Sequence, residues 1–273
     1  MRMEPHSERQ PVEVAVISLK GAAPRRRLME EQFTRLPLPW HFFDAHGSLV
    51  NLAPRYDPAT LYHKFGRTLS VPELGCWSSH YTVIEEFLQR GSSDYLLVFE
   101  DDVIFDTAFA LPALVDLCRA RGIHYMRLFG MYYADAVRLS FFFDRSIIRY
   151  KSSPAGAQSY ILSRTGAERM LAALGEIEAT IDLAMDHFWK TGLPIYAVFP
   201  FPVIERYSPS SVPMQAATPL DRMNEAIWTA NRVCSRLSKL RENVSLAASD
   251  RKFRREALRF QQILTEDNSG AAS

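Results

Sequence analysis

The sequence predicts a three-layer α/β fold with a mixed sheet, followed by a basic helical extension. Up to about residue 130, apolar β-branched stretches alternate with amphipathic helical stretches, which is typical of a largely parallel sheet covered by helices. Apolar stretches at 139–143 and 147–150 flank a short polar turn and predict an antiparallel hairpin. The C-terminal part carries apolar residues at helical spacing among many basic ones. We therefore expect a globular domain over residues 12–219 and a helical tail over residues 220–265.

The separate elements follow from the spacing of apolar residues along the chain. Short continuous apolar stretches predict buried strands, and apolar residues three or four positions apart predict helices. The expected strands are 12–19, 40–45, 95–99, 125–129, 139–143, 147–150, 159–162 and 195–199. The expected helices are 24–36, 72–90, a stretch that ends before Gly122, 164–174 and 181–190. Residues 51–67, rich in turn formers and aromatic side chains, are expected to form an irregular functional loop.

Composition and charge exclude several functional classes. Of the 273 residues, 47% are hydrophobic and 23% are charged, as in ordinary soluble proteins. Lys and Arg number 32 against 31 for Asp and Glu, so no overall charge favours nucleic-acid binding. No apolar run approaches the roughly 18 residues of a membrane span, and residues 1–13 do not resemble a secretory signal. The three cysteines, Cys76, Cys118 and Cys234, have no paired spacing, so we expect reduced thiols and a cytoplasmic location.

Three consecutive carboxylates, Glu100, Asp101 and Asp102, directly follow the apolar strand expected at 95–99. In open α/β sheets, ligands bind at the carboxyl ends of the strands. Neighbouring carboxylates repel one another unless a cation or a strong donor compensates, and Mg²⁺ and Mn²⁺ prefer oxygen ligands. Side chains alternate along an extended chain, so Glu100 and Asp102 are expected to face one way and Asp101 the other. A metal–diphosphate site is favoured over an acidic turn that only caps the next helix.

An arginine cluster, Arg25–Arg27, follows the first expected strand and opens a helix. Guanidinium groups match phosphate oxygens, and a helix N-terminus adds N–H donors and a favourable dipole. The alternative is a solvated helix face. Because the first strand–helix turn belongs to the same sheet edge as the acidic triplet, we favour an anion-binding role for this cluster.

Two further segments carry candidate side chains. His80, on the helix expected at 72–90, would contact a ligand or hold an acidic neighbour, or else would be a buried histidine with its ring nitrogens bonded. Asp182 and Asp186 are four residues apart on an expected helix and so share one face. A carboxylate beside a hydroxyl can act as a general base. The alternative for this pair is a helix cap and a salt bridge.

The tail is locally basic, with ten Lys or Arg and four acidic residues between Arg222 and Gln262. Two helices separated near Ser249-Asp250 are expected. They would either lie on an anionic membrane surface or pack on the globular domain or on a second subunit, and both alternatives stay open. The apolar residues that define the two stripes are Ile227, Ala230, Cys234 and Leu237, and then Phe253, Ala257, Phe260 and Leu264.

In order and spacing, the segments resemble glycosyltransferase family 25, the lipooligosaccharide-type β-galactosyltransferases related to collagen galactosyltransferases. The similarity covers about residues 12–210. It departs from the family at Gly21, where a basic residue is usual, and after His80, where aromatic and basic residues are missing. The segments that carry it are Val16–Lys20 with Arg25-Arg26, Phe42–Ala45, Pro72–Cys76 with Ser79-His80, Tyr95–Asp102, Gly156–Ser163 with Gly166-Ala167, and Ile181-Asp182.

The resemblance implies a GT-A-like, Rossmann-type nucleotide-sugar-binding fold and an inverting, metal-dependent hexosyl transfer in lipopolysaccharide or lipooligosaccharide biosynthesis. The usual donor is UDP-galactose, and the acceptor is a hydroxyl of a saccharide or glycolipid. A metal-dependent phosphohydrolase and a non-catalytic membrane- or partner-binding adaptor are the alternative functions. In the implied site, Glu100 and Asp102 bind Mn²⁺ or Mg²⁺, and Asp182 or Asp186 is the base. The residues near the donor are Ser18, Lys20, Arg25, Arg26, His80 and Asp101.

Overall fold

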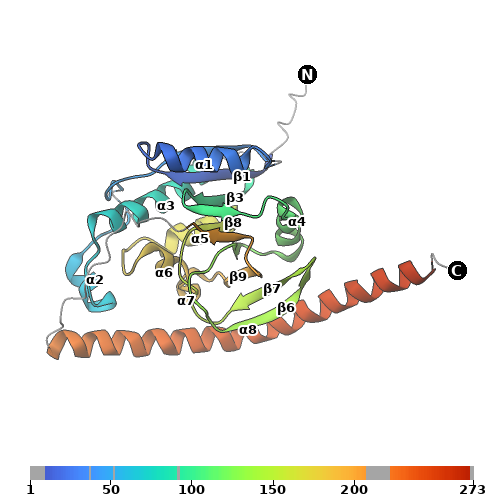
Figure 1. Ribbon diagram of the computed structural model, residues 1–273. Coiled ribbons are helices and arrows are strands. Elements are labelled where there is room, and N and C mark those ends of the chain that lie inside the picture. Colours follow the sequence, from blue (N-terminus) through green and yellow to red (C-terminus); the bar gives the residue numbers. More distant parts are fainter. Residues whose placement is uncertain (1–9, 37, 52, 91–92, 207–221, 271–273) are drawn as a thin grey trace, which may run out of the picture.

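The computed structural model describes residues 10–36, 38–51, 53–90, 93–206 and 222–270, with the side chains at 10–11, 222–224 and 259–270 left out. Eight strands form one mixed sheet with helices on both faces (Figure 1). These strands are β1 (Gln10–Ser18), β2 (Trp40–Asp44), β3 (Ser93–Glu100), β5 (Tyr125–Arg127), β6 (Ala136–Phe142), β7 (Arg145–Tyr150), β8 (Ser159–Ser163) and β9 (Tyr196–Phe199). The helices are α1 (Ala23–Phe33), α2 (Pro58–Phe65), α3 (Val71–Arg90), α4 (Leu111–Arg121), α5 (Arg164–Ala173), α6 (Ile181–Met185), α7 (Phe188–Thr191) and α8 (Arg222–Gly270).

The strand order is β2-β1-β3-β8-β5-β9-β7-β6. Strands β2, β1 and β3 are mutually parallel, β8 runs antiparallel between β3 and β5, and the β6–β7 hairpin forms the far edge. The predicted α/β class, mixed sheet, hairpin and C-terminal helical extension are therefore confirmed. Two short strands that were not predicted, β4 (Val103–Phe105) and β10 (Val203–Glu205), pair antiparallel beside this sheet.

The hydrophobic core lies on both faces of the sheet. Along β1, Ala15 and Ile17 pack on one side with the apolar face of α3, and Val14 and Val16 pack on the other side with Phe33 of α1. A strand buried on both faces has no polar alternation, which is why Val14–Ile17 is a continuous apolar run. The first core also takes in residues of α5, α6 and α7, and the second takes in those of α4.

A close backbone approach fixes α3 under the loop that follows β2. A Cβ atom at Gly75 would lie 2.5 Å from the His46 carbonyl oxygen, so only glycine fits there. The backbone N–H groups of His46 and Val50 donate to the hydroxyls of Ser79 and Ser78 at 2.8 and 3.1 Å. The first three turns of α3, which carry His80, are thereby held against the loop that follows β2.

The prediction of an irregular loop over residues 51–67 is wrong in part, because residues 58–65 form α2. The Asp57 carboxylate caps this helix by accepting from the N–H groups of Ala59 and Thr60, and Pro58 stands at its first position. An aspartate followed by proline is a helix-start pattern, and here it stands among turn-forming residues that favour an irregular loop.

The tail is one helix, α8, and the prediction of two helices is wrong. The expected break at Ser249-Asp250 does not occur because Asp250 is buried and forms a two-pronged ion pair with Arg149 of β7, at 2.8 and 2.7 Å. Asn243, two turns earlier, accepts from the same guanidinium at 2.8 Å. The predicted domain boundary at residues 219 and 220 lies outside the described residues.

The two predicted apolar stripes of the tail differ in their surroundings. Phe253 and Ala257 are buried, and Phe253 stacks on Tyr196 of β9, so this stripe packs on the domain. Ile227 and Leu237 of the first stripe are exposed. Phe260 and Leu264 lie outside the described side chains. Within the part of the chain that the structure describes, no helix is both long and apolar enough to cross a bilayer.

His187, between α6 and α7, is expected to make stability depend on pH. Burial, with Lys239 of α8 adding to it, lowers the pKa of His187 from 6.5 to about 4. The unfolded chain therefore takes up a proton first, and stability is lost as the pH falls from about 6.5 to about 4. The His187→Gln variant should lose less of its melting temperature than the wild type over that interval. An equally steep loss in the variant would contradict this assignment.

Candidate active site

The arginine cluster and the acidic triplet meet at one edge of the sheet. Because Ile17 pairs with Glu100, the carboxyl ends of the parallel strands β1 and β3 lie side by side. Buried Ser18 donates its hydroxyl to Asp101 Oδ2 at 2.6 Å. Arg25 Nη1 lies 3.0 Å from Asp101 Oδ1 and 3.5 Å from Asp102 Oδ2. Residues 76 positions apart in sequence thus form one charged cluster.

The expected alternation within the triplet is wrong. Glu100 is the last residue of β3, and Asp101 and Asp102 belong to the turn that leads into β4. In that turn both aspartates approach the same guanidinium of Arg25, whereas Glu100 points to His80. The alternation of side chains holds only for extended backbone, and the strand ends at Glu100, before either aspartate.

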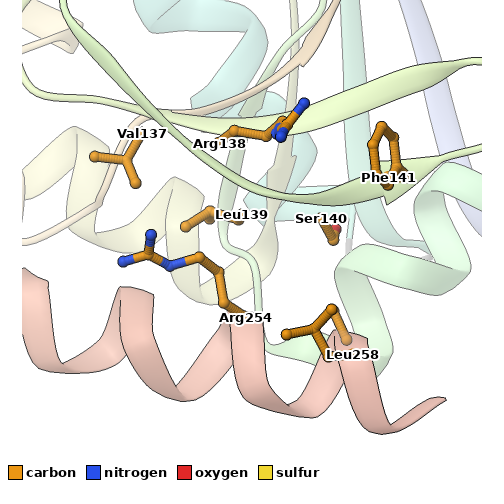
Figure 2. A pocket seen from close by; sticks show the side chains of 8 residues that line it. Val137, Arg138, Leu139, Ser140, Phe141, Arg254 and Leu258 are labelled. Atoms are coloured by element: carbon orange, nitrogen blue, oxygen red, sulfur yellow. The ribbon is translucent and has the colours of Figure 1, made fainter. Parts of the chain in front are cut away.

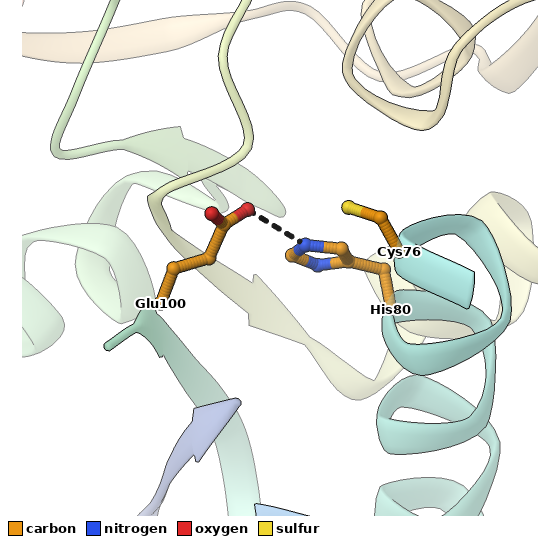
Figure 3. A group of neighbouring side chains, drawn as sticks. All are labelled: Cys76, His80 and Glu100. Atoms are coloured by element: carbon orange, nitrogen blue, oxygen red, sulfur yellow. Dashed lines mark hydrogen bonds and ion pairs between the residues drawn. The ribbon is translucent and has the colours of Figure 1, made fainter. Parts of the chain in front are cut away.

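Glu100 is held by a buried histidine. His80 is fully buried, and its Nε2 lies 3.1 Å from Glu100 Oε1 (Figure 3). Its Nδ1 lies 3.0 Å from the Tyr160 hydroxyl of β8. A carboxylate only accepts, so Nε2 donates to Glu100 and orients it. The potential ligand atoms of Cys76, His80 and Glu100 all lie within 4.8 Å of one another. Burial, and then the Glu100 charge, raise the pKa of the Cys76 thiol well above its usual value. Hard cations such as Mn²⁺ and Mg²⁺ prefer oxygen to sulfur ligands, so this sulfur is a poor ligand for them.

Asp102 offers a better place for a hard cation. Its Oδ1 atom is buried and has no hydrogen-bond partner among the described residues. Burial first, and then the neighbouring Glu100 charge, raise the pKa of Asp102 from 3.8 to about 7 even though Arg25 opposes the shift. A buried, unpartnered carboxylate oxygen is costly, and a divalent cation would compensate it. Glu100 and Asp102 therefore fit Mn²⁺ or Mg²⁺ in donor type and in local charge.

Arg26 and Lys20 are placed differently from Arg25. Arg26 Nη2 donates to the Ser18 carbonyl at 2.8 Å and pairs with Asp44 of β2, and its guanidinium lies 4.7 Å from the Phe42 ring centre. This side chain links the ends of β1 and β2 and shapes the edge of the site. Lys20 is exposed at the same edge.

The expected helix 181–190 is divided into α6 and α7, and Asp182 and Asp186 differ in burial although both carboxylates bond to the 153–156 segment. Asp186 ends α6 and is fully buried. Its Oδ1 accepts from Arg127 Nη2 at 2.7 Å and Nε at 2.9 Å, and its Oδ2 accepts from the Ser153 hydroxyl at 2.6 Å. Burial raises the pKa of Asp186, and the Arg127 charge opposes that shift. The end of α6 is thereby fixed against Arg127 of β5.

Asp182 lies at the surface of the same network. It is half-buried, and its Oδ2 accepts from the Gly156 backbone N–H at 2.9 Å. Gly156 has a φ of 77°, a conformation that glycine adopts without strain. Arg127 donates to the carbonyl oxygen of Gly156 and, at 3.4 Å, to that of Asp182. One buried guanidinium thus positions both the 155–156 segment and Asp182.

Sequence reasoning missed Arg127 and Tyr160. An arginine inside the apolar strand 125–129 is itself the pattern that could have identified a buried ion pair, because isolated charges are rarely buried without a partner. Tyr160 stands in a fully buried strand, β8, and nothing in its neighbouring sequence indicates that its hydroxyl reaches His80.

The Arg127→Met variant is expected to lose about 3–5 kcal/mol of unfolding free energy, because it leaves the Asp186 charge buried without its partner. Urea denaturation would measure the loss. The Arg119→Met variant, which breaks the exposed pair with Asp116, is the matched control and should lose no more than about 1 kcal/mol. Equal losses of unfolding free energy in the two variants would show that the buried Arg127–Asp186 pair stabilises the fold no more than an exposed ion pair does.

Comparison with known proteins gives a family match over most of the described domain. Residues 12–189 match the model of glycosyltransferase family 25 (LPS biosynthesis protein). The chain is 25% identical over 182 residues to lipooligosaccharide biosynthesis protein lic2B of Haemophilus influenzae, covering 63% of this chain and 66% of that protein. It is 28% identical over 202 residues to the lacto-N-neotetraose biosynthesis glycosyltransferase LgtE of Neisseria gonorrhoeae, covering 68% and 71%. Over a segment of 109 residues, the chain is 38% identical to the inactive glycosyltransferase 25 family member 3 of Homo sapiens. This segment covers 36% of this chain and 17% of that protein.

Proposed function

The chain belongs to glycosyltransferase family 25, and we propose that it transfers galactose from UDP-galactose to a hydroxyl of a glycan acceptor in lipooligosaccharide synthesis. The names of two bacterial relatives, a lipooligosaccharide biosynthesis protein and a lacto-N-neotetraose biosynthesis glycosyltransferase, support the class of acceptor. The proposal adds the donor sugar, the stereochemistry and the metal to the family assignment.

One observation carries the proposal: a buried, unpartnered oxygen of Asp102 stands beside Arg25 at the carboxyl edge of β1 and β3. A site of this kind combines oxygen ligands for a cation with a guanidinium for phosphate oxygens. Both are needed where a nucleotide diphosphate leaves, because negative charge develops on it in the transition state. The carboxyl edge of parallel strands is also where α/β folds bind nucleotides.

Each residue of the cluster has a distinct part in binding the donor. Glu100 and Asp102 would hold Mn²⁺ or Mg²⁺, which would supply positive charge against the diphosphate. His80, which also contacts the Tyr160 hydroxyl, holds the Glu100 carboxylate in place through its Nε2. Ser18 holds Asp101, and Asp101 holds Arg25, whose guanidinium stabilises the charge on the departing UDP. Arg26 keeps the strand ends in place through Ser18 and Asp44.

The transfer needs a base on the acceptor side, and we assign it to Asp182. The acceptor hydroxyl gives its proton to the Asp182 carboxylate, and its oxygen attacks the anomeric carbon. The bond from that carbon to the diphosphate oxygen breaks on the opposite face, so the electron pair leaves with UDP and the configuration inverts. Asp186 is unsuited to this role because Arg127, Tyr125 and Ser153 engage its oxygens in the interior.

Thermal unfolding with UDP, in the presence and absence of Mn²⁺, tests the site. Ligand at about a hundred times its dissociation constant adds roughly 2.7 kcal/mol of stability, so a rise of several degrees in melting temperature is expected with both present. UDP without Mn²⁺ should give a much smaller rise. The absence of any shift would favour a non-catalytic adaptor, a reading that the inactive human relative makes necessary to test.

A screen of UDP- and GDP-sugars then distinguishes the reaction types. A glycosyltransferase breaks the bond between the sugar and the diphosphate, so slow hydrolysis without an acceptor releases UDP and free hexose. A phosphohydrolase would break a phosphorus–oxygen bond and release UMP with a sugar phosphate. We expect UDP as the product, with UDP-galactose preferred.

A further inference from the structure

An exposed apolar stripe runs along the outer side of α8. Val233, Leu237, Leu240 and Val244 follow the i, i+4, i+7, i+11 spacing of one helix face and are 48%, 61%, 62% and 68% exposed. Figure 1 shows α8 along the β6 side of the domain and extending past it. The opposite side of α8 is fixed by Asp250 and Phe253, so the helix cannot rotate to bury the stripe without breaking the Arg149 ion pair.

The charges of α8 are divided between its two sides. Two of its acidic residues face the domain, where Asp250 pairs with Arg149 and Glu256 pairs with Arg121 at 2.7 Å. At about 100° per residue, Arg236 and Arg241 adjoin the stripe on its two sides. Further exposed basic residues on the helix are Arg232, Arg251, Lys252, Arg254 and Arg255. Exposed basic residues thus outnumber the exposed acids of the described part of α8, Glu225 and Glu256, which gives the exposed face a positive charge.

A groove between α8 and the edge strand β6 continues this surface. Figure 2 shows Arg254 and Leu258 of α8 opposite Leu139 and Ser140 of β6. The cavity has a volume of about 380 Å³, and apolar side chains with two arginines, Arg138 and Arg254, line it. Leu258 is exposed and lies on the same helix face as Val244, fourteen residues earlier. Apolar walls beside guanidinium groups match an anionic amphiphile, with its phosphate at the arginines and its chains on the apolar side chains.

We propose that the outer face of α8, together with the groove beside β6, binds the surface of an anionic lipid bilayer. An apolar stripe between arginines is the arrangement of helices that lie in a membrane interface. A second copy of the chain would bring equally positive borders together, which opposes self-association through the same stripe. A bilayer of anionic lipid instead supplies the opposite charge and an apolar layer.

Sedimentation of the full chain with lipid vesicles tests the proposal. Binding is expected with vesicles that contain phosphatidylglycerol, should weaken at high salt and should be absent with pure phosphatidylcholine. The Leu237→Glu/Leu240→Glu variant should bind more than about tenfold more weakly, because it places charge in the apolar stripe. The matched control, Ser238→Glu/Ser245→Glu, adds the same charge at exposed positions of α8 outside the stripe and should bind more tightly than the stripe variant.

Equal weakening in the two variants, or binding that salt does not change, would overturn the proposal. Absence of binding by the wild type would overturn it as well. If the wild type is a dimer in sedimentation velocity and the stripe variant is a monomer, the stripe is instead the contact between two copies of the chain. Both variants should retain the melting-temperature shift with UDP and Mn²⁺, because α8 does not contribute to the cluster around Arg25. That readout separates failure of the membrane surface from failure of the proposed activity.

Discussion

The Asp102→Asn variant is expected to lower turnover by about a hundredfold or more, as does the removal of a group that stabilises transition-state charge. The amide keeps the shape of the side chain but removes the negative charge at the buried oxygen. We therefore expect weaker activation by Mn²⁺ as well as a lower maximal rate. Initial rates of UDP release at several Mn²⁺ concentrations would measure both effects.

The fold of this variant should stay intact. Burial and Glu100 already hold the pKa of Asp102 at about 7, so a neutral group suits this place in the absence of metal. Its melting temperature should be no lower than that of the wild type at neutral pH. The Asp144→Asn variant, in the exposed turn between β6 and β7, is the matched control and should keep full activity. Near-normal turnover of Asp102→Asn that a chelator does not affect would refute a metal site at the triplet.

The sheet could be predicted from the sequence because local pattern determines its strands. Val14–Ile17 and Tyr95–Phe99 are continuous apolar runs, and each is buried on both faces. Their parallel arrangement places the residues that follow them at one edge, so the proximity of Arg25 to the triplet also followed from topology. The order and direction of the strands are enough to predict that these segments lie close together, without knowledge of individual side-chain contacts.

The remaining features depend on contacts between residues that are distant in sequence. Asp250 looked like a helix break because aspartate favours caps and turns, yet Arg149, 101 residues away, pairs with it inside a continuous helix. Asp186 looked like a partner for Asp182 because of the four-residue spacing, yet Arg127 draws it into the core, 59 residues away. In both cases a buried arginine decides the outcome, and each arginine stands in a strand whose neighbours are mostly apolar.

The Asp182→Asn variant is expected to lower turnover by about a hundredfold to ten-thousandfold, the range for loss of a general base. Asparagine can still accept the hydrogen bond from the Gly156 N–H, so the backbone at 155–156 should keep its conformation. The affinity for UDP should stay nearly unchanged, because the base contacts the acceptor and not the donor. Steady-state kinetics with saturating acceptor, together with UDP binding by calorimetry, would separate the two effects.

The Asp186→Asn variant completes this experiment, since it removes the other carboxylate of the pair. It leaves Arg127 with a neutral partner, so its main effect should be a lower melting temperature, with activity retained by the molecules that stay folded. Loss of activity in a stably folded Asp186→Asn variant, with Asp182→Asn active, would transfer the base to Asp186. Activity in both variants would place the base elsewhere, and the half-buried carboxylate of Asp182 would then serve only to hold Gly156.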